Sequence, residues 1–140
     1  MASPPVPAPA PAPAPGGGGR LREHPQRRFA APEQFFDLQA AVEHLAAEPG
    51  MMAEGHRQIA LYRHGPMTVG LFIFERGGRL PDHSAEGVVI LHGLSGRFEV
   101  RTAQGSHALR PGQILILAPN VKHDIAALES SRMLLTVCLE

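Results

Sequence analysis

From Gly55 onward the chain is a series of short β-type segments separated by turn residues. Such a series is typical of an all-β sandwich or barrel. The spacing leaves no room for crossover helices, so neighbouring strands must pair antiparallel. The predicted strands are 59–63, 67–75, 88–94, 97–102, 106–110, 113–118, 124–128 and 132–140. The predicted turns lie at 65–66, 77–78, 95–96, 104–105, 111–112 and 119–120.

Size and charge exclude several classes of protein. The chain has 140 residues, enough for one domain, and 13 basic and 13 acidic side chains that give a formal net charge of zero. Nucleic-acid and anionic-membrane binders normally carry a basic excess, so neither partner is expected. No apolar stretch is long enough for a transmembrane helix. Cys138 is the single cysteine and is expected to be a small buried core residue; any metal must be held by histidine or carboxylate.

The first part of the chain differs in composition from the rest. Residues 1–19 alternate Pro with Ala and end in four glycines, which predicts a disordered tail, either a simple leader or a proline-rich ligand. This tail lacks the features of a signal peptide, so we expect a cytoplasmic protein. Residues 20–55 are predicted to form a basic linker and an amphipathic helix, and residues 56–140 the barrel.

One helix is predicted over about residues 33–47. Phe35, Leu38, Val42 and Leu45 recur at helical spacing, with Pro32 suited to the first turn. No second helical pattern follows, so a DNA-reading helix pair is not expected.

Two strand segments, 69–74 and 113–118, are apolar on both faces instead of alternating. This pattern predicts that both faces of the sheet are covered, one by the barrel interior and the other by a partner subunit. We therefore expect a homodimer.

Three of the eight histidines lie at positions that suggest a site. His83 stands at the boundary between a Gly-Gly turn and a long apolar strand. His92 is the single polar side chain of the segment 88–94, and His123 ends a turn after another apolar strand. An imidazole in such surroundings needs a partner for its ring nitrogens, which can be a metal, a water or a backbone group. The remaining histidines, at positions 24, 44, 56, 64 and 107, are expected at the surface.

The segments 77–100 and 109–123 resemble the two consecutive motifs of the cupins, small β-barrel proteins, and the resemblance covers about residues 57–139. Gly77, His83 and Gly96 match the first motif; Gly112 and His123 match the second, in which Asn120 stands in place of a glycine. The resemblance implies a jelly-roll barrel of the RmlC-like type, preceded here by one helix. It also implies that His83 and His123 face each other at the barrel mouth.

The departures from the motifs concern the metal ligands. Ala85 and Val89 stand where the family has a second histidine and a glutamate, and Ala127 replaces a late asparagine. A third ligand could come from His92 or Glu86. Alternation along the strand predicts that His92 points out of the barrel, where it would lie at a subunit interface. A bulge at residues 86–87 would instead turn His92 inward.

The resemblance thus implies a divalent metal (Fe, Mn, Ni or Zn) held by His83 and His123 in a cavity that accepts a small organic molecule, and His92 is the candidate for a third ligand. The implied function is a metal-binding cupin with dioxygenase- or isomerase-type activity. The alternative is a sensory or ligand-binding cupin without turnover. Candidate lining residues of the cavity are Leu71, Ile73, Ile90, Leu115, Leu117, Met133 and Leu135.

Overall fold

The computed structural model describes residues 22–140, so the predicted tail, residues 1–19, lies outside the described residues. The chain divides into two compact units, residues up to 49 and residues 50–140. Residues 50–55 belong to the second unit and include a 3-10 turn, η1 (Ala53–Gly55). The backbone N–H of Glu75 donates to the carbonyl of Gly55 at 2.9 Å and ties this turn to the barrel.

The first unit contains α1 (Pro25–Arg28) and α2 (Leu38–Ala47). The predicted start of the longer helix, near residue 33, is wrong because the Asp37 carboxylate caps it, accepting a hydrogen bond from the Ala40 N–H at 3.1 Å. Phe35 therefore precedes the helix and is 47% exposed, whereas Val42 and Leu45 are buried. No helix of residues 22–140 is long and apolar enough to cross a membrane.

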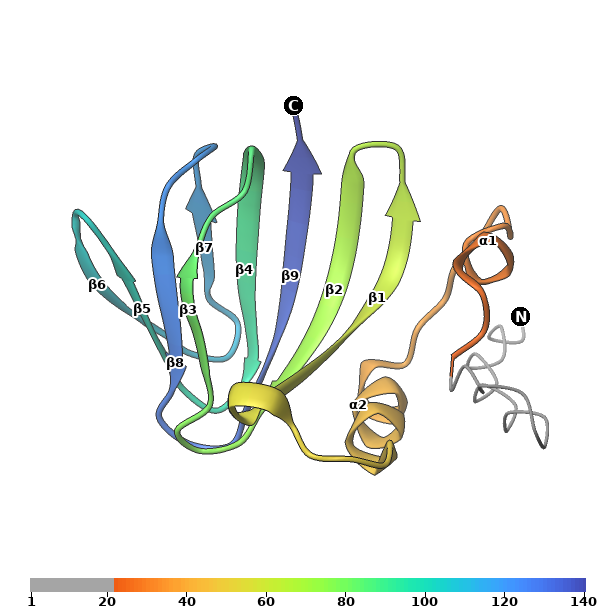
Figure 1. Cartoon of the computed structure of the whole chain (residues 1–140), viewed down its shortest axis with the longest axis horizontal. Helices are drawn as coiled ribbons and strands as arrows, with labels where there is room; N and C mark the ends of the chain where they lie inside the picture. The colour runs from red at the N-terminus through yellow and green to blue at the C-terminus, as the bar shows by residue number, and fades with distance from the viewer. Residues whose placement is uncertain (1–21) are drawn as a thin grey trace. The chain divides into compact units, whose positions relative to one another are not determined.

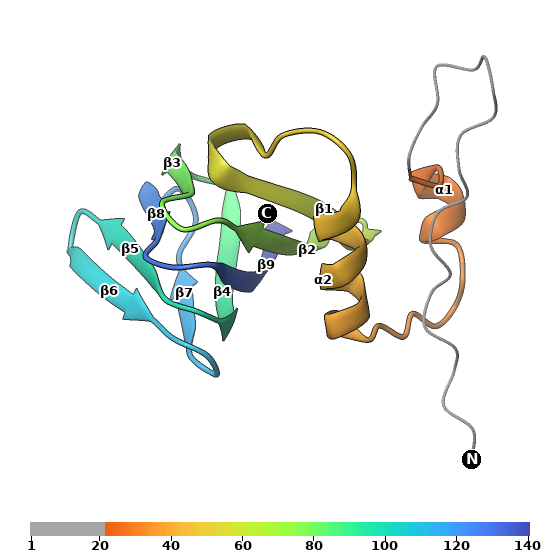
Figure 2. The same ribbon diagram turned by 90° about the horizontal axis from the view of Figure 1, so that it is seen from below.

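The second unit is the predicted all-β barrel, built from two antiparallel sheets that face each other (Figures 1 and 2). One sheet has the order β1-β2-β9-β4-β7 and the other β3-β8-β5-β6. The strands are β1 (His56–His64), β2 (Met67–Phe74), β3 (Arg79–His83), β4 (Gly87–Ser95), β5 (Phe98–Thr102), β6 (Gly105–Leu109), β7 (Ile114–Leu117), β8 (His123–Ala127) and β9 (Ser131–Leu139).

β3 is the one strand that the sequence did not predict. Its sequence contains Pro81, which has no N–H to donate to a ladder. The strand tolerates this proline because it lies at the edge of its sheet. Its pairing with β8 is irregular between Leu80 and His83.

The barrel core lies between the two sheets and is almost wholly apolar. Phe74 and Phe98 meet edge to face, with ring centroids 5.1 Å apart. The buried core consists of Phe72, Phe74, Val89, Leu91, Phe98, Val100, Leu109, Leu117, Ile125, Ala127, Met133 and Leu135.

The second face of the five-stranded sheet is only partly covered. Leu71 and Ile73 point away from the core and are nevertheless buried, as the sequence predicted for this segment. Ile114 and Ile116, on the same outer face, are 58% and 56% exposed in the single chain, so the covering of β7 by a partner subunit stays a prediction. The predicted lining residues Leu71, Ile73 and Ile90 therefore lie outside the barrel interior, because Phe72 and Phe74 occupy the inner face of β2.

Two turn glycines have a positive φ but different surroundings. Gly112 has φ +81° with open space around a hypothetical Cβ. Gly96 has φ +75°, and a Cβ there would collide with Ser131, a buried residue whose hydroxyl accepts from the Arg97 N–H and donates to the Glu129 carbonyl. The turn before β5 is thus packed directly against the start of β9.

We predict that Gly112→Ala lowers the free energy of unfolding by about 1–2 kcal/mol, the cost of a left-handed alanine. Gly96→Ala should cost at least about 1 kcal/mol more, because the backbone strain is joined by a collision in a buried region. Urea unfolding followed by circular dichroism measures both. Equal losses for the two variants would contradict the close packing at Gly96.

Candidate functional site

His123 is the only charged or ionisable side chain among the buried residues of the described chain. It begins β8, points to the same inner face as Ile125 and Ala127, and is 2% exposed. Its Nδ1 lies 3.1 Å from the Val121 carbonyl oxygen. Since a carbonyl can only accept, Nδ1 carries the proton in the neutral ring and donates it there. Nε2 then carries a lone pair, and this atom is buried and has no hydrogen-bond partner.

His83 lies directly opposite His123 in the β3–β8 ladder. The two ring centroids are 5.5 Å apart, with the ring planes at 82° to each other. Burial lowers the pKa of His83 below its usual value, and the neighbouring His123 lowers it further. The His83 ring is therefore held in its neutral form, which is the form that can accept a proton or bind a cation. The structure thus brings together two of the three predicted residues.

His92 does not join this pair. The ladder between β4 and β9 runs without interruption from Gly87 to Gly93, and its one irregularity follows at Gly93/Ser95. The bulge at residues 86–87 that would turn His92 inward is therefore absent. Val89 and Leu91 point into the core, and His92 points to the opposite face of the sheet.

No other metal-binding side chain joins His83 and His123 in the part of the chain that the structure describes. Glu86 is exposed, and no group of three or more His, Cys, Asp or Glu side chains within residues 22–140 is arranged to hold a metal ion. Val89 is 2% exposed in the core and Ala85 packs against it, so both positions at which the cupin motif carries ligands are apolar here. The predicted site of three imidazoles is reduced to two.

Asn120 completes the turn that leads to His123. It adopts φ 66°, the left-handed conformation expected where it replaces the glycine of the motif. Its backbone N–H donates to the Ala85 carbonyl at 2.8 Å, which joins this turn to the segment between β3 and β4. The loops that carry the two imidazoles are thereby linked.

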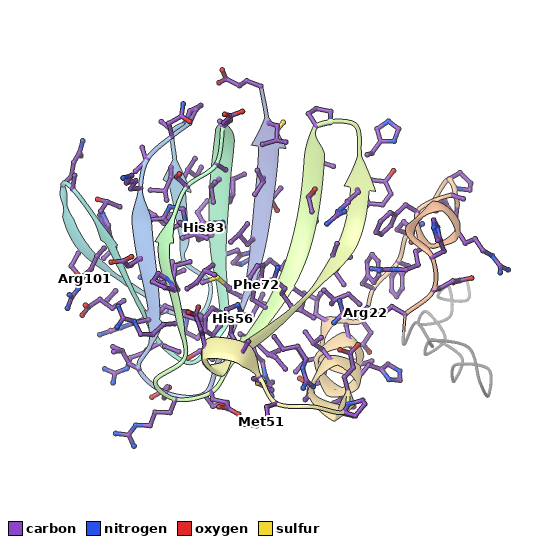
Figure 3. The ribbon with its side chains drawn as sticks, viewed as in Figure 1. Arg22, Met51, His56, Phe72, His83 and Arg101 are labelled. Carbon is purple, nitrogen blue, oxygen red and sulfur yellow. The ribbon has the colours of Figure 1, made fainter. Side chains whose placement is uncertain are left out.

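Sequence reasoning placed His56 at the surface, but the structure places it partly within the fold. The ring begins β1 opposite Phe74 and stacks on Phe74 and Phe72, with centroids 5.3 and 6.2 Å away. Its Nδ1 is buried without a hydrogen-bond partner. Figure 3 shows His56 beside Phe72, away from His83. The inward direction follows from the pairing of His56 with Phe74, which the local sequence does not reveal.

Comparisons with known proteins identify the fold. No family model matches the sequence, and no curated protein matches it. Among solved structures, a cupin superfamily protein from Desulfitobacterium hafniense has a TM-score of 0.65 at 17% identity, covering 81% of this chain and 96% of that one. An RmlC-like cupin from Shewanella frigidimarina has a TM-score of 0.60 at 16% identity, covering 64% and 81%. KdgF from Halomonas sp. has a TM-score of 0.58 at 22% identity, covering 65% and 86%.

These matches show that the chain has the cupin fold. The predicted jelly-roll barrel and the resemblance on which it rested are confirmed. Since the identities are low, the matches establish the architecture and leave the activity to be argued from the residues.

We predict that His123→Leu changes the free energy of unfolding by less than about 1 kcal/mol in the presence of a chelator. The lost bond to Val121 costs stability, but the variant also removes a buried nitrogen that has no partner. Ile125→Ala, two residues further along the same face, should cost about 2–5 kcal/mol. A loss at His123 as large as that at Ile125 would indicate that the imidazole serves only the packing of the core.

Proposed function

We propose that this protein is a small-molecule-binding cupin in which His83 and His123 hold a divalent metal ion. The observation that carries the proposal is the His123 ring, whose Nδ1 is fixed by the Val121 carbonyl while its buried Nε2 has no partner. Histidines that bind metals are usually oriented in this way, by donating the other ring N–H to a carbonyl or carboxylate. Fe, Mn, Ni and Zn all accept imidazole, and the choice among them is left to experiment.

The residues fit such an ion at two coordination positions. His123 would supply Nε2 from a rigid position, and His83 is kept neutral by burial, as a ligand must be. Protein sites for catalytic metals usually provide three ligands, so affinity here should be low. A bound ion would supply Lewis acidity and open coordination positions to a chelating oxygen ligand, which is the chemistry of a dioxygenase- or isomerase-type reaction.

The protein's own residues contribute an apolar environment around the pair. Ala85 and Val121, each two residues from one of the two histidines, pack against the apolar core. This arrangement favours the binding of a small organic molecule that is polar at one end and otherwise apolar.

The second candidate function is ligand binding without metal or turnover. It is favoured by one observation, the apolar residues Ala85 and Val89 at the two positions where the family carries further ligands. In that case Nε2 of His123 would accept a hydrogen bond from a hydroxyl or carboxylic acid group of the ligand. The two candidates differ in whether a chelator abolishes binding.

We predict that the full chain, freed of metal and without a histidine tag, binds Ni²⁺ or Zn²⁺ at one site per chain in isothermal titration calorimetry. His83→Ala and His123→Ala should each weaken this binding at least about tenfold, or about 1.4 kcal/mol. His92→Ala is the matched control and should leave the affinity unchanged, since that ring lies on the other face of β4.

A gain-of-function variant tests the same assignment. Ala85→His restores a ligand position of the motif and should raise the metal affinity about tenfold or more, with a matching rise in melting temperature when metal is added. Binding that is unaffected by His83→Ala and His123→Ala would refute the metal site. An organic ligand that binds equally in chelator would favour the second candidate.

A further inference from the structure

The inner face of the four-stranded sheet extends the histidine pair by one more polar residue. The ladder between β5 and β8 runs up to Arg101 opposite Asp124, so the next position sets Thr102 beside His123. Residues opposite each other in a ladder share a face of the sheet, and Thr102 therefore faces the barrel interior as His123 does. His83, His123 and Thr102 form one row across β3, β8 and β5, which are adjacent strands (Figure 1).

The Thr102 hydroxyl is available to a bound molecule. Its oxygen accepts a hydrogen bond from the backbone N–H of Gln104 at 3.1 Å, so its own proton is left to be donated elsewhere. Thr102 is partly exposed, and its ladder partner Gly105 leaves open space where a side chain would stand. Since neighbouring strands lie about 4.8 Å apart, one small molecule can contact both Thr102 and His123.

The side chains around the row bring no negative charge to it. Glu99 of β5 and Asp124 of β8 stand at the alternate positions of their strands and face the other side of the sheet. Val89 occupies the position at which the cupin motif has a glutamate, and Ala85 the position of a histidine. Both of these residues belong to the apolar core or pack against it.

The next step rests on the proposed metal ion. Imidazoles bind a metal in their neutral form, so two of them leave the full positive charge of a divalent ion uncompensated. A charge in apolar surroundings is stable only when an opposite charge is close to it. Since neither Val89 nor Ala85 supplies that charge, the bound molecule must bring it.

We propose that the ligand of this site is a small carboxylate with a second oxygen on the neighbouring carbon, an α-hydroxy or α-keto acid, and that Thr102 donates a hydrogen bond to it. The carboxylate supplies the missing negative charge, and its two neighbouring oxygens suit the open positions of an ion held by two imidazoles. A hydrogen bond from Thr102 to a carboxylate is charge-assisted and therefore stronger than one to an alcohol. Thr102 thus favours acids over neutral molecules of the same size.

Isothermal titration calorimetry of the full chain with Zn²⁺ tests the proposal. Zinc is kept at the same concentration in cell and syringe, and the heat of titration into zinc alone is subtracted. Glycolate should bind at least about tenfold more tightly than ethylene glycol, which has the same two carbons and no charge. Thr102→Val should weaken glycolate binding about tenfold, whereas Thr102→Ser keeps the hydroxyl and should stay within about twofold of the wild type. Zinc affinity without glycolate should be the same in all three proteins.

A second pair of variants tests the charge argument. Ala85→Glu places a carboxylate at a ligand position of the motif and should tighten zinc binding while weakening glycolate binding at least about tenfold. Ala85→Gln has the same size without the charge and should change glycolate binding much less. Failure of the wild type to bind zinc would refute the metal site and this inference with it. Zinc binding with equal affinities for glycolate and ethylene glycol, or with no effect of Thr102→Val, would overturn this inference alone.

Discussion

The pairing of β3 with β8 determines what chemistry this barrel can offer. The ladder sets His83 opposite His123, and the core residues Ile125 and Ala127 fix which way β8 faces. A shift of one residue in this register would send His123 to the solvent side and leave the barrel with an apolar interior alone. The site is therefore a consequence of strand register, which in turn depends on the packing of the core.

The same interior shows why the site is small. The segment that resembles the first motif carries one imidazole, His83, and has the apolar side chains Ala85 and Val89 at two positions where that motif has polar ones. Val89 is part of the continuous core, so its side chain contributes to packing at that position. The outcome is a pair of imidazoles, one of them buried, with apolar residues at the two neighbouring motif positions.

Much of the fold could be predicted from the sequence, because strands and turns leave local signals. Gly65, Gly77 and Gly112 all have positive φ at predicted turns, and Asn120 tolerates it as expected. The strand β3 was not predicted because Pro81 argues against a strand. The sheet order places β3 at an edge, next to β8, where a proline is tolerated.

The candidate site was harder to predict because inward or outward direction depends on bulges that leave little trace in sequence. One bulge at residues 86–87 would have reversed His92, and the structure has its irregularity after Gly93 instead. His123 and His83 were found through a motif, whereas His56 was missed because its contacts with Phe72 and Phe74 come from a strand pairing that the local sequence does not reveal.

The two imidazoles lie on strands that have different numbers of neighbouring strands. β8 lies between β3 and β5, whereas β3 has a ladder partner on one side only and is interrupted by Pro81. The end of β3 can detach at lower cost than any part of β8, because local opening starts where hydrogen bonds are fewest. His123 is therefore held more firmly than His83, and a molecule that contacted both rings would also stabilise the edge strand of this sheet.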